Sequence, residues 1–301
     1  MTALAQTPSP SAAPPNPMSG GFSAALRILL RDRLAAAGAA MIVVLVLIAI
    51  FAPWLAPFPD QGRGVTDVGS ANLAPSLHHL FGTDDLGRDM LSRVIMGTRP
   101  ALLVSVSVVL VAGAIGVPLG AIAGYRGGWI DEVLMRVTEV FQSFPPLLLA
   151  MVVVAVLGPG LRNAGVALAL SWWTWYARLV RAEARSLRER PFVLAAEAIG
   201  VPQRKIIWRH IIKNSLTPVL VQGTVDVGTV VLAAGSLAFI GLGAQPPSPD
   251  WGLMVAQGRG QIFTSWWIST FAGLAIFLTV LSFNLLGDAL RDLLDPRKVK
   301  R

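Results

Sequence analysis

Few side chains in this sequence have the types and spacing that a chemical site requires. Gly82 and Gly87, followed directly by an arginine and an aspartate, reproduce the glycine spacing of a phosphate-binding loop. Such a loop needs a lysine for the phosphates and a hydroxyl for magnesium, and this segment has neither. Asp84 and Asp85 add negative charge that repels phosphate. We expect no nucleotide site here, and the full motif occurs nowhere else in the sequence.

The residue counts argue against thiol and metal chemistry. The chain has 0 cysteines, which excludes disulfides, thiolate metal sites and cysteine nucleophiles. Its 3 histidines include the adjacent pair His78 and His79, a spacing that does not build a histidine metal centre. We therefore expect no catalytic residue and no metal site.

Asp226 is an acidic residue deep inside a long apolar run. At the centre of a membrane span, an ionised carboxylate costs at least about 2.5 kcal/mol unless it faces water or a cation. Thr229 follows one helical turn later on the same face. We expect these two side chains to face a polar space rather than lipid.

The composition identifies the solvent around these residues. The chain of 301 residues is 54% hydrophobic and 14% charged, with a mean hydropathy of +0.62, which is typical of an integral membrane protein. Apolar runs of about 20 residues predict membrane-spanning helices. We predict an all-α fold with six transmembrane helices, the third kinked at Pro145 and Pro146. The predicted spans are about 34–58, 100–125, 137–160, 163–180, 216–239 and 264–287.

The segments outside these spans complete the expected organisation. Residues 1–30 and 298–301 are predicted to be cytosolic tails, the first of them disordered, around a membrane domain at 31–297. Of the 25 basic residues, 19 lie on one side of the membrane if both termini are cytosolic, and this bias predicts that orientation. The net charge of +8 does not indicate nucleic-acid binding, because the basic residues are not organised with base-stacking aromatics.

A basic loop, residues 183–213, separates the fourth and fifth predicted spans. The segment RAEARSLRERPFVLAAEAI predicts a helix up to Ile199. Gly200 suits the left-handed residue that ends a helix, and Pro202 suits the first turn of a second one. We predict two short helices joined at a sharp corner. Anchoring to anionic lipid head groups would explain the arginines of this loop, but not the ordered alanines and glycine around the corner.

The loop also carries a family resemblance. The sequence LAAEAIG, followed by HIIKNSLTPVL, resembles the cytoplasmic EAA motif of ATP-binding-cassette importer permeases. Leu194 stands where the motif usually has a glutamate, and Lys213 stands where proline is frequent. Three further segments, FGTDDLGRDMLSRVIMGTR, GLGAQPPSPDWG and FAGLAIFLTVLSFNLLGDALRDLLDPR, are similar to the C-type subunit of dipeptide, oligopeptide and nickel importers. The resemblance runs from about residue 30 to Arg297.

This resemblance implies a permease subunit with the fold of type I importers in a bacterial plasma membrane. Its partners would be a second permease subunit, two ATPase subunits or domains that bind ATP and magnesium, an external substrate-binding protein and membrane lipid; the chain itself would hold no cofactor. The motif implies that the coupling loop docks on an ATPase. The residues expected to do so are Ala195, Ala196, Glu197, Gly200, Val201, Pro202, Arg204, Lys205 and His210.

Two more sites follow once the resemblance is accepted. The segments 82–93 and 245–251 are expected on the external face. Either the binding protein docks on them, or they only cap helix ends. The candidate docking residues are Asp84, Asp85, Arg88, Gln245, Ser248 and Trp251. Asp226 and Thr229 are the pathway candidates. Asp226 has three possible environments: a basic side chain of the partner permease, the ammonium end of a peptide, or water in the cavity.

Other functions compete with this interpretation. A nickel or other small-solute importer has the same sequence pattern, because the binding protein usually selects the substrate. An ion-coupled secondary transporter needs intramembrane carboxylates and usually an internal repeat, and only Asp226 fits. A membrane enzyme needs a nucleophile and base or a metal cluster, and the sequence has no such set.

Overall fold

The computed structural model describes residues 32–294, which form helices and turns without a β-strand. The expected all-α fold is confirmed for this part of the chain, and the predicted tails at 1–30 and 298–301 lie outside it. The helices are α2 (Arg33–Leu55), α3 (Pro59–Arg63), η2 (Val68–Ser70), α4 (Met90–Arg126), α5 (Gly128–Gln142), α6 (Pro146–Leu157), α7 (Leu161–Arg188), α8 (Pro191–Ala198), α9 (Gln203–Ile206), η3 (Ile207–Ile212), α10 (Lys213–Phe239), α11 (Trp251–Gly258), η4 (Arg259–Gln261) and α12 (Trp267–Leu294).

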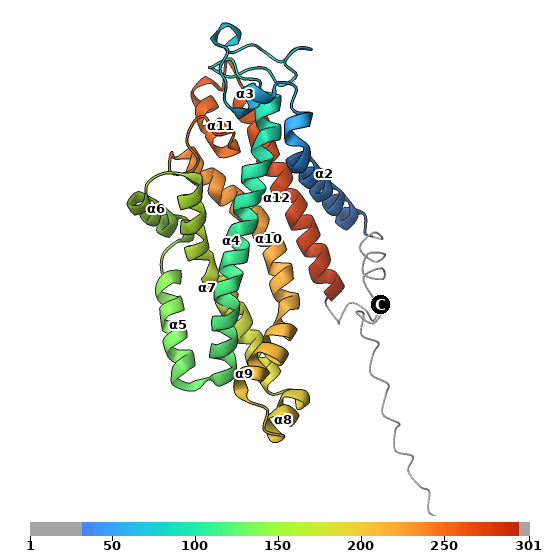
Figure 1. The fold of residues 1–301 in the computed structure, drawn as a ribbon, viewed down its shortest axis with the longest axis vertical. Helices are drawn as coiled ribbons and strands as arrows, with labels where there is room; N and C mark the ends of the chain where they lie inside the picture. The colour runs from blue at the N-terminus through green and yellow to red at the C-terminus, as the bar shows by residue number, and fades with distance from the viewer. Residues whose placement is uncertain (1–31, 295–301) are drawn as a thin grey trace, which may run out of the picture.

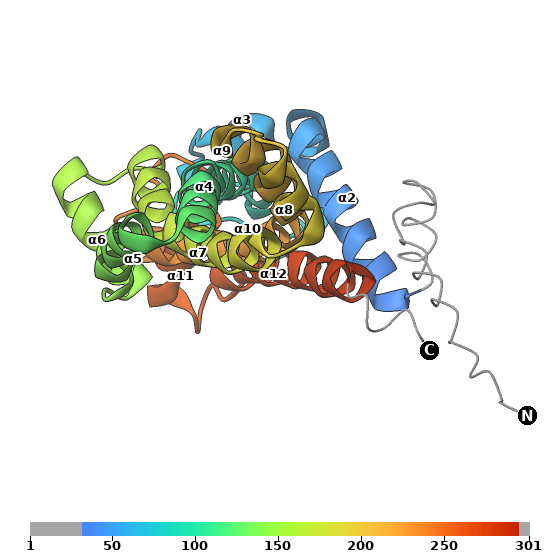
Figure 2. The ribbon, with the colours of Figure 1, turned by 90° about the horizontal axis from the view of Figure 1, so that it is seen from below.

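The long helices α4, α7, α10 and α12 run along the long axis of the molecule (Figure 1). α3 and α11 lie at one end, which we call the α11 end (residues 56–93 and 240–266). α8 and α9 lie at the opposite end, which we call the α8 end (residues 125–131 and 181–213). Along this axis, α2 packs on α12 and α4, whereas α5 and α6 lie on the other side of the molecule (Figure 2).

Hydropathy and length mark most of these helices as membrane spans. Within residues 32–294, four helices are long and apolar enough to cross a membrane: Arg33–Leu55, Met90–Arg126, Gln203–Phe239 and Trp267–Leu293. The pair α5 and α6 is a fifth candidate, bent by 83° at its break. α7 has 28 residues but carries charged side chains in its second half, so it does not pass the same test. Each predicted span thus corresponds to a helix or to this bent pair.

The third predicted span is a bent pair rather than one kinked helix. The bend falls at Pro145 and Pro146, where the prolines were expected to act. Pro145 offers no N–H to continue α5, and a proline disfavours helical geometry in the residue before it. Pro146 then begins α6 at the helical position that tolerates proline best.

α4 and α7 are among the helices that extend well beyond their predicted spans. α4 begins at Met90 rather than near residue 100, because the Asp89 side chain caps it by accepting from the Ser92 N–H. α7 continues to Arg188 rather than ending near residue 180. Hydropathy does not detect these polar turns, since they project beyond the apolar stretch that a bilayer requires.

A row of glycines joins α4 to α7. Gly116, Gly120 and Gly124 recur every fourth residue, on one face of α4. A Cβ atom at these positions would clash with backbone carbonyl oxygens of α7, at Trp173, Ala177 and Arg181 respectively. Small residues at this spacing let two helices in a membrane approach closely. The glycines therefore hold α4 and α7 together along much of their length.

A proline in α2 is compensated by an arginine from α4. Pro53 lies inside α2 and has no N–H to bond the carbonyl of Ala49, four residues earlier. The Arg99 guanidinium donates to that carbonyl from Nε at 2.5 Å and to the Ile50 carbonyl from Nη2 at 2.7 Å. Arg99 thus satisfies an acceptor left open by the proline and ties α2 to α4.

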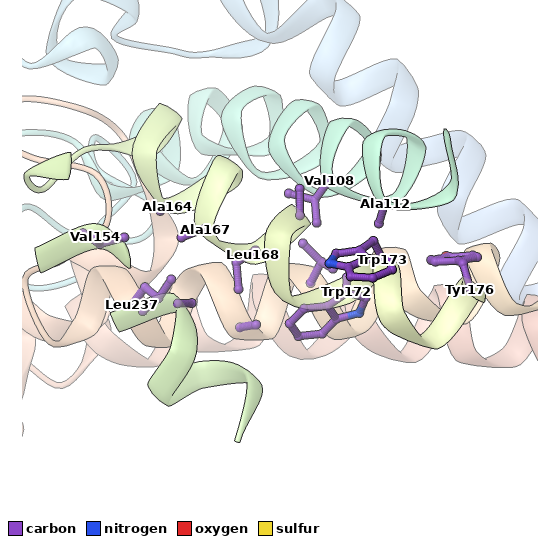
Figure 3. Close-up of a cluster of buried hydrophobic side chains, with 14 of the residues drawn as sticks. Val108, Ala112, Val154, Ala164, Ala167, Leu168, Trp172, Trp173, Tyr176 and Leu237 are labelled. Atoms are coloured by element: carbon purple, nitrogen blue, oxygen red, sulfur yellow. The ribbon is translucent and has the colours of Figure 1, made fainter. Parts of the chain in front are cut away.

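The largest cluster of buried apolar side chains lies between α4, α6, α7 and α10 (Figure 3). α7 contributes Trp172, Trp173 and Tyr176, all of them buried. Val108 and Ala112 of α4 lie against them, and Leu237 comes from α10. This core holds the aromatic side chains of α7 beside the middle of α10, where Asp226 is found.

Candidate coupling, docking and pathway sites

The corner at Gly200 is a regular helix ending. Gly200 has φ +77°, its N–H bonds the Glu197 carbonyl at 2.9 Å, and the Val201 N–H bonds the Ala196 carbonyl at 3.0 Å. These two bonds form a Schellman motif, which favours glycine at the left-handed position. Val201 also packs in the same apolar cluster as Ala196. The predicted helix ending at Gly200 is confirmed, with the short helix α8 before the corner.

The corner packs on the rest of the chain through one apolar face. Val193 and Ala196 of α8 and Ile206 of α9 are buried in a cluster that includes Val180, Ala184 and Leu187 of α7. The opposite face is in solvent: Leu194 is 50% exposed and Ile199 is 81% exposed. Ala195, Glu197, Gly200, Pro202, Arg204 and Lys205 are also exposed, and His210 is half-buried.

Glu197 is held by its own chain. The Tyr125 hydroxyl, at the end of α4, donates to Glu197 Oε1 at 2.7 Å. Among residues 32–294, this is the side-chain hydrogen bond that joins α8 to the rest of the molecule. Glu197 therefore positions α8 on α4, while Leu194, at the motif's usual glutamate position, stays exposed.

Two details of the predicted coupling loop are wrong. The helix expected to run to Ile199 is broken between α7 and α8, because Pro191 begins a new helix at Arg190. The second helix after the corner was expected to be short, but α9, the π-helical turns of η3 and α10 follow one another from Gln203 to Phe239. The non-helical parts reduce to residues 189–190 and 199–202.

Ion pairs hold the first turn of α5 against α7. Arg181 on α7 donates to Asp131 Oδ1 at 2.5 Å and to Oδ2 at 2.7 Å, and Arg185 reaches Oδ2 at 3.1 Å. A two-pronged arginine–carboxylate contact is geometrically specific. It sets the position of α5 relative to α7, immediately beside the corner.

The two candidate docking segments lie together at the α11 end. Arg93, fully buried, donates to the Pro247 and Ser248 carbonyls at 3.5 and 3.3 Å. The Trp251 indole N–H donates to the Val94 carbonyl at 2.9 Å. Hydrogen bonds thus hold the segments 82–93 and 245–251 next to each other, although they lie about 150 residues apart in the sequence. Their proximity agrees with the expectation that both lie on one face of the molecule.

Burial divides the docking candidates. The Arg88 guanidinium donates to Asp84 Oδ2 at 2.7 Å, and Asp84 and Arg88 are only 2% and 1% exposed. Trp251 is buried as well. The expectation that these three side chains face a partner is wrong for this conformation, because they bond one another or the chain itself. Asp85 and Gln245 are exposed and Ser248 is half-buried, so these three remain candidates.

The phosphate-loop spacing at 82–87 has a structural cause. Gly82 and Gly87 have φ +72° and +73°, which are left-handed values that suit glycine. A Cβ at Gly87 would clash with the Asp67 carbonyl, so neighbouring backbone fills the space a phosphate would need. The glycines here build turns around the Asp84–Arg88 pair.

The pathway candidates line a cavity of about 550 Å³. It lies between the α5–α6 bend, Trp172 and Trp175 of α7, and one face of α10 that includes Asp226 and Thr229. Asp226 is 6% exposed, and its Oδ1 accepts a hydrogen bond from Gln222 at 3.0 Å. Asp226 and Thr229 thus lie on one face of α10 beside the same cavity, as their helical spacing indicated, whereas most of the other lining residues are apolar; that this cavity is a polar pathway stays a prediction.

Several structural residues were missed by sequence reasoning. The glycines of the α4–α7 contact stand in GVPLGAIAG, whose four-residue spacing is a visible signal of close helix packing. Pro53 within an apolar run signals an open carbonyl, but nothing local identifies Arg99 as its donor. Tyr125 and Asp131 carry no signal, since their partners lie more than 45 residues away.

Comparison with known proteins places this geometry in a family. Residues 116–300 match the model of the binding-protein-dependent transport system inner membrane component. Residues 22–75 match the N-terminal transmembrane domain of oligopeptide transport permease C. The chain belongs to this family of ABC importer permeases, as its coupling motif and outer segments predicted.

Named relatives and a solved structure sharpen the assignment. A probable D,D-dipeptide permease, DdpC of Escherichia coli, is 44% identical over 259 residues, 86% of each chain. A dipeptide permease, DppC of Alkalihalophilus pseudofirmus, is 42% identical over 294 residues, 97% of this chain and 96% of the relative. A glutathione permease, GsiD of Escherichia coli, is 43% identical over 267 residues, 89% and 88% of the two chains.

The fold is also similar to a solved importer. The inward-facing MetNI methionine ABC transporter matches with a TM-score of 0.56 and 20% identity, over 68% of this chain and 97% of that one. At this identity the match concerns the fold alone. The architecture is that of a type I ABC importer permease.

Proposed function

We propose that the chain forms half of the translocation pathway of a peptide importer in the bacterial plasma membrane, beside a second, related permease subunit. Three relatives that cover most of the chain are named as dipeptide or glutathione permeases. Two ATPase subunits bind ATP and magnesium, a binding protein delivers the peptide, and this chain carries out no catalysis. Nickel or another small solute is the alternative cargo.

One observation supports the proposal most strongly: the corner at 195–205 leaves apolar side chains in solvent. Ile199 is 81% exposed and Leu194 is 50% exposed, and the cations Arg204 and Lys205 of the same corner are exposed as well. A contiguous apolar surface rimmed by polar residues marks a protein interaction site. The ATPase groove covers Ile199, and the packed inner face of α8 transmits the movement of the ATPase to α4 and α7 as a rigid body.

Replacing Gly200 tests coupling. A side chain there meets no neighbouring atom, so its cost comes from the left-handed backbone, about 1–2 kcal/mol. We expect Gly200→Val to reorient α9 and to lower peptide uptake per ATP hydrolysed, measured in vesicles containing the complete transporter. Membrane insertion should be normal.

Gly241 provides a matched control. It has φ +85°, a Cβ there would also meet nothing, and it lies at the α11 end. Gly241→Val should therefore impose similar strain without changing the ratio of uptake to hydrolysis. A Gly200→Val transporter with normal coupling would contradict the role of the corner.

Orientation can be tested because the chain has no native cysteine. We propose cytosolic termini, which place Asp85 outside and Ile199 inside. In intact cells, a membrane-impermeant maleimide should label the Asp85→Cys variant, and it should label Ile199→Cys only after the membrane is opened and the ATPase subunits are removed. The reverse pattern would invert the topology and remove the coupling proposal.

The binding protein is proposed to land on the exposed residues of the α11 end. Photoreactive groups at Asp85 and Ser248 should capture it when peptide is present. The same group at Glu132, an exposed residue of α5 near the other end, should not. An active complex that gives no product at either α11-end position would exclude this docking surface.

A further inference from the structure

The cavity beside Asp226 has a composition that suits a cation. We call it the Asp226 cavity. On α10 its lining follows one helical face, and the rest of its lining is apolar, with two tryptophans of α7 beside the prolines and leucine of the α5–α6 bend. The α10 residues are Gln222, Asp226, Thr229, Leu232, Ala233 and Ser236; the opposing residues are Pro145, Pro146, Leu147, Trp172 and Trp175. No lysine, arginine or histidine of residues 32–294 lines it.

The Asp226 carboxylate is only half satisfied by the chain. Its Oδ1 accepts from the Gln222 amide, whereas its buried Oδ2 has no hydrogen-bond partner among residues 32–294. The buried Tyr176 hydroxyl is a neighbouring donor that acts on the carboxylate as a hydrogen bond, although neither Tyr176 Oη nor Asp226 Oδ2 makes a hydrogen bond of regular geometry among residues 32–294. No salt bridge to Asp226 occurs within the same residues. A buried, unpaired carboxylate is costly, and a bound cation would offset that cost.

The surrounding groups favour an ammonium ion. A primary ammonium group has three donors, and Asp226 Oδ2 offers it a charged acceptor. The Thr229 hydroxyl donates to the Val225 carbonyl at 3.3 Å, which leaves its lone pairs able to accept. Trp172 and Trp175 supply aromatic faces, which attract cations through the ring quadrupole. A free carboxylate, by contrast, would be repelled by Asp226.

We propose that the Asp226 cavity binds the amino-terminal ammonium group of the peptide during its passage, an inference that rests on the proposed peptide-import function. The contact orients the peptide with its amino end toward α10. The cavity is open rather than enclosed and offers one charged acceptor. We therefore expect the peptide to bind only briefly before it is released. The competing occupant is a basic side chain of the partner permease, and the experiment separates the two.

Two variants isolate the charge. Asp226→Asn keeps the side-chain volume and removes the charge, whereas Asp226→Glu keeps the charge. In vesicles containing the complete transporter and saturating binding protein, we expect Asp226→Asn to slow dialanine uptake about tenfold, since a hydrogen bond to a charged group is worth that much or more. N-acetyl-dialanine uptake should change less than twofold, and Asp226→Glu should restore part of the dialanine rate.

A second measurement reports on the cavity without transport. Dicyclohexylcarbodiimide modifies carboxyl groups in apolar surroundings, and mass spectrometry can quantify its adduct at Asp226 in the assembled complex. Dialanine should slow this modification, and N-acetyl-dialanine should not. Asp250, also buried but at the α11 end, provides an internal reference whose modification neither peptide should change.

The outcomes are distinguishable. Equal slowing of both substrates by Asp226→Asn, or equal protection by both peptides, would overturn the ammonium site. Loss of assembly in Asp226→Asn, with Asp226→Glu assembling normally, would instead show that Asp226 pairs with the partner permease. If the unaltered transporter carries neither peptide, the proposed function fails. In that case the carbodiimide measurement still tests the cavity: modification of Asp226 that neither peptide slows, or that both slow equally, rejects the ammonium site. Modification that dialanine alone slows supports it.

Discussion

The segments 82–93 and 245–251 at the α11 end and the corner at 195–205 at the α8 end differ in how they hold their charged side chains. At the α11 end, Asp84, Arg88 and Arg93 are at most 2% exposed and bond within the chain. The indole N–H of Trp267 adds a bond to the Thr83 carbonyl at 2.9 Å. At the α8 end, Ile199 and Arg204 lie in solvent, and the Tyr125–Glu197 bond is the side-chain hydrogen bond that holds α8 among the described residues.

This difference separates a self-supporting region from one that needs a partner. Buried charges that satisfy each other keep segments 82–93 and 245–251 in one arrangement, whether or not another protein is bound. Exposed apolar residues on a small helical corner gain stability only when another surface covers them. The α11 end therefore presents a preformed face, whereas the corner completes its packing on binding.

The largest effect should follow from damage to the α4–α7 contact, because α4 reaches both ends. Gly120→Leu places a side chain against the Ala177 carbonyl, and backbone on both sides leaves no room to relax. Overpacking typically costs about 1–3 kcal/mol and more where backbone must move. We expect no assembled complex by size-exclusion chromatography in detergent. Gly113→Leu, on a face of α4 where a Cβ meets nothing, should assemble normally.

The next effect tests whether the α11 end supports itself. Asp84→Ala leaves the buried cations Arg88 and Arg93 without their carboxylate. Breaking a buried ion pair in this way costs about 3–5 kcal/mol. The melting temperature of the purified complex should fall by several degrees. The exposed neighbour variant Asp85→Ala should melt with the parent, and equal melting of all three proteins would show that the pairing is not structural.

A smaller effect concerns the side-chain hydrogen bond that holds α8 among residues 32–294. Tyr125→Phe removes the donor to Glu197, whose other side is in solvent, so the loss is about 1 kcal/mol. Amide hydrogen exchange in α8 should become about fivefold faster, since a change of that size is a factor of about five in an opening equilibrium. Glu197→Gln keeps an oxygen acceptor and should exchange more slowly than Tyr125→Phe. Protection that does not depend on Tyr125 would mean that apolar packing alone holds the corner.

The smallest effect is a pH dependence at the α11 end. Burial raises the pKa of the Asp250 carboxyl above its ordinary value of 3.8, and the N–H groups of Leu253 and Gly252 oppose this only partly. The folded chain therefore retains a proton that the unfolded chain has lost. Asp250 lowers stability at pH values above its raised pKa, and this penalty fades as the pH falls toward 3.8.

Asp250→Asn isolates that contribution. Asparagine still accepts the Leu253 N–H at the start of α11, so the cap is kept. The variant should be more stable than the parent at neutral pH, by less than about 1 kcal/mol, and the difference should shrink in acid. A difference in melting temperature that is constant between neutral and acidic pH would exclude the carboxyl as its source.

Prediction from sequence succeeded where the physical cause is local. Long apolar runs located the spans, because lipid requires about 20 apolar residues in a helix whatever their neighbours are. Gly200 and the Schellman ending depend on residues within one turn of each other, and Pro145 and Pro146 located the bend. Asp226 and Thr229 share a face because helical periodicity alone puts them there.

Prediction failed where a partner from a distant segment decides the outcome. Asp84 and Arg88 look like surface charges in a turn-rich segment, yet both are buried. Arg93 pairs with Asp84 and donates to the carbonyls of residues 247–248. The bend at Pro145 was expected as a kink because its angle depends on how α6 packs on α7, which no local pattern states. The early start of α4 at Met90 has a local cause instead, because its cap is the preceding residue, Asp89, which hydropathy alone does not detect.

By itself, therefore, the sequence determined a membrane protein with a glycine corner between its fourth and fifth predicted spans, through hydropathy and turn chemistry, and its motifs resemble those of ABC importer permeases. Only the tertiary structure decided which charges are buried. It also decided that Arg99 donates a hydrogen bond to the carbonyl that Pro53 leaves without a donor, and that Trp172 and Trp175 line the same cavity as Asp226. Hydropathy and turn preferences act over a few residues, whereas ion pairs, closed carbonyls and cavities are made by segments that only folding brings together.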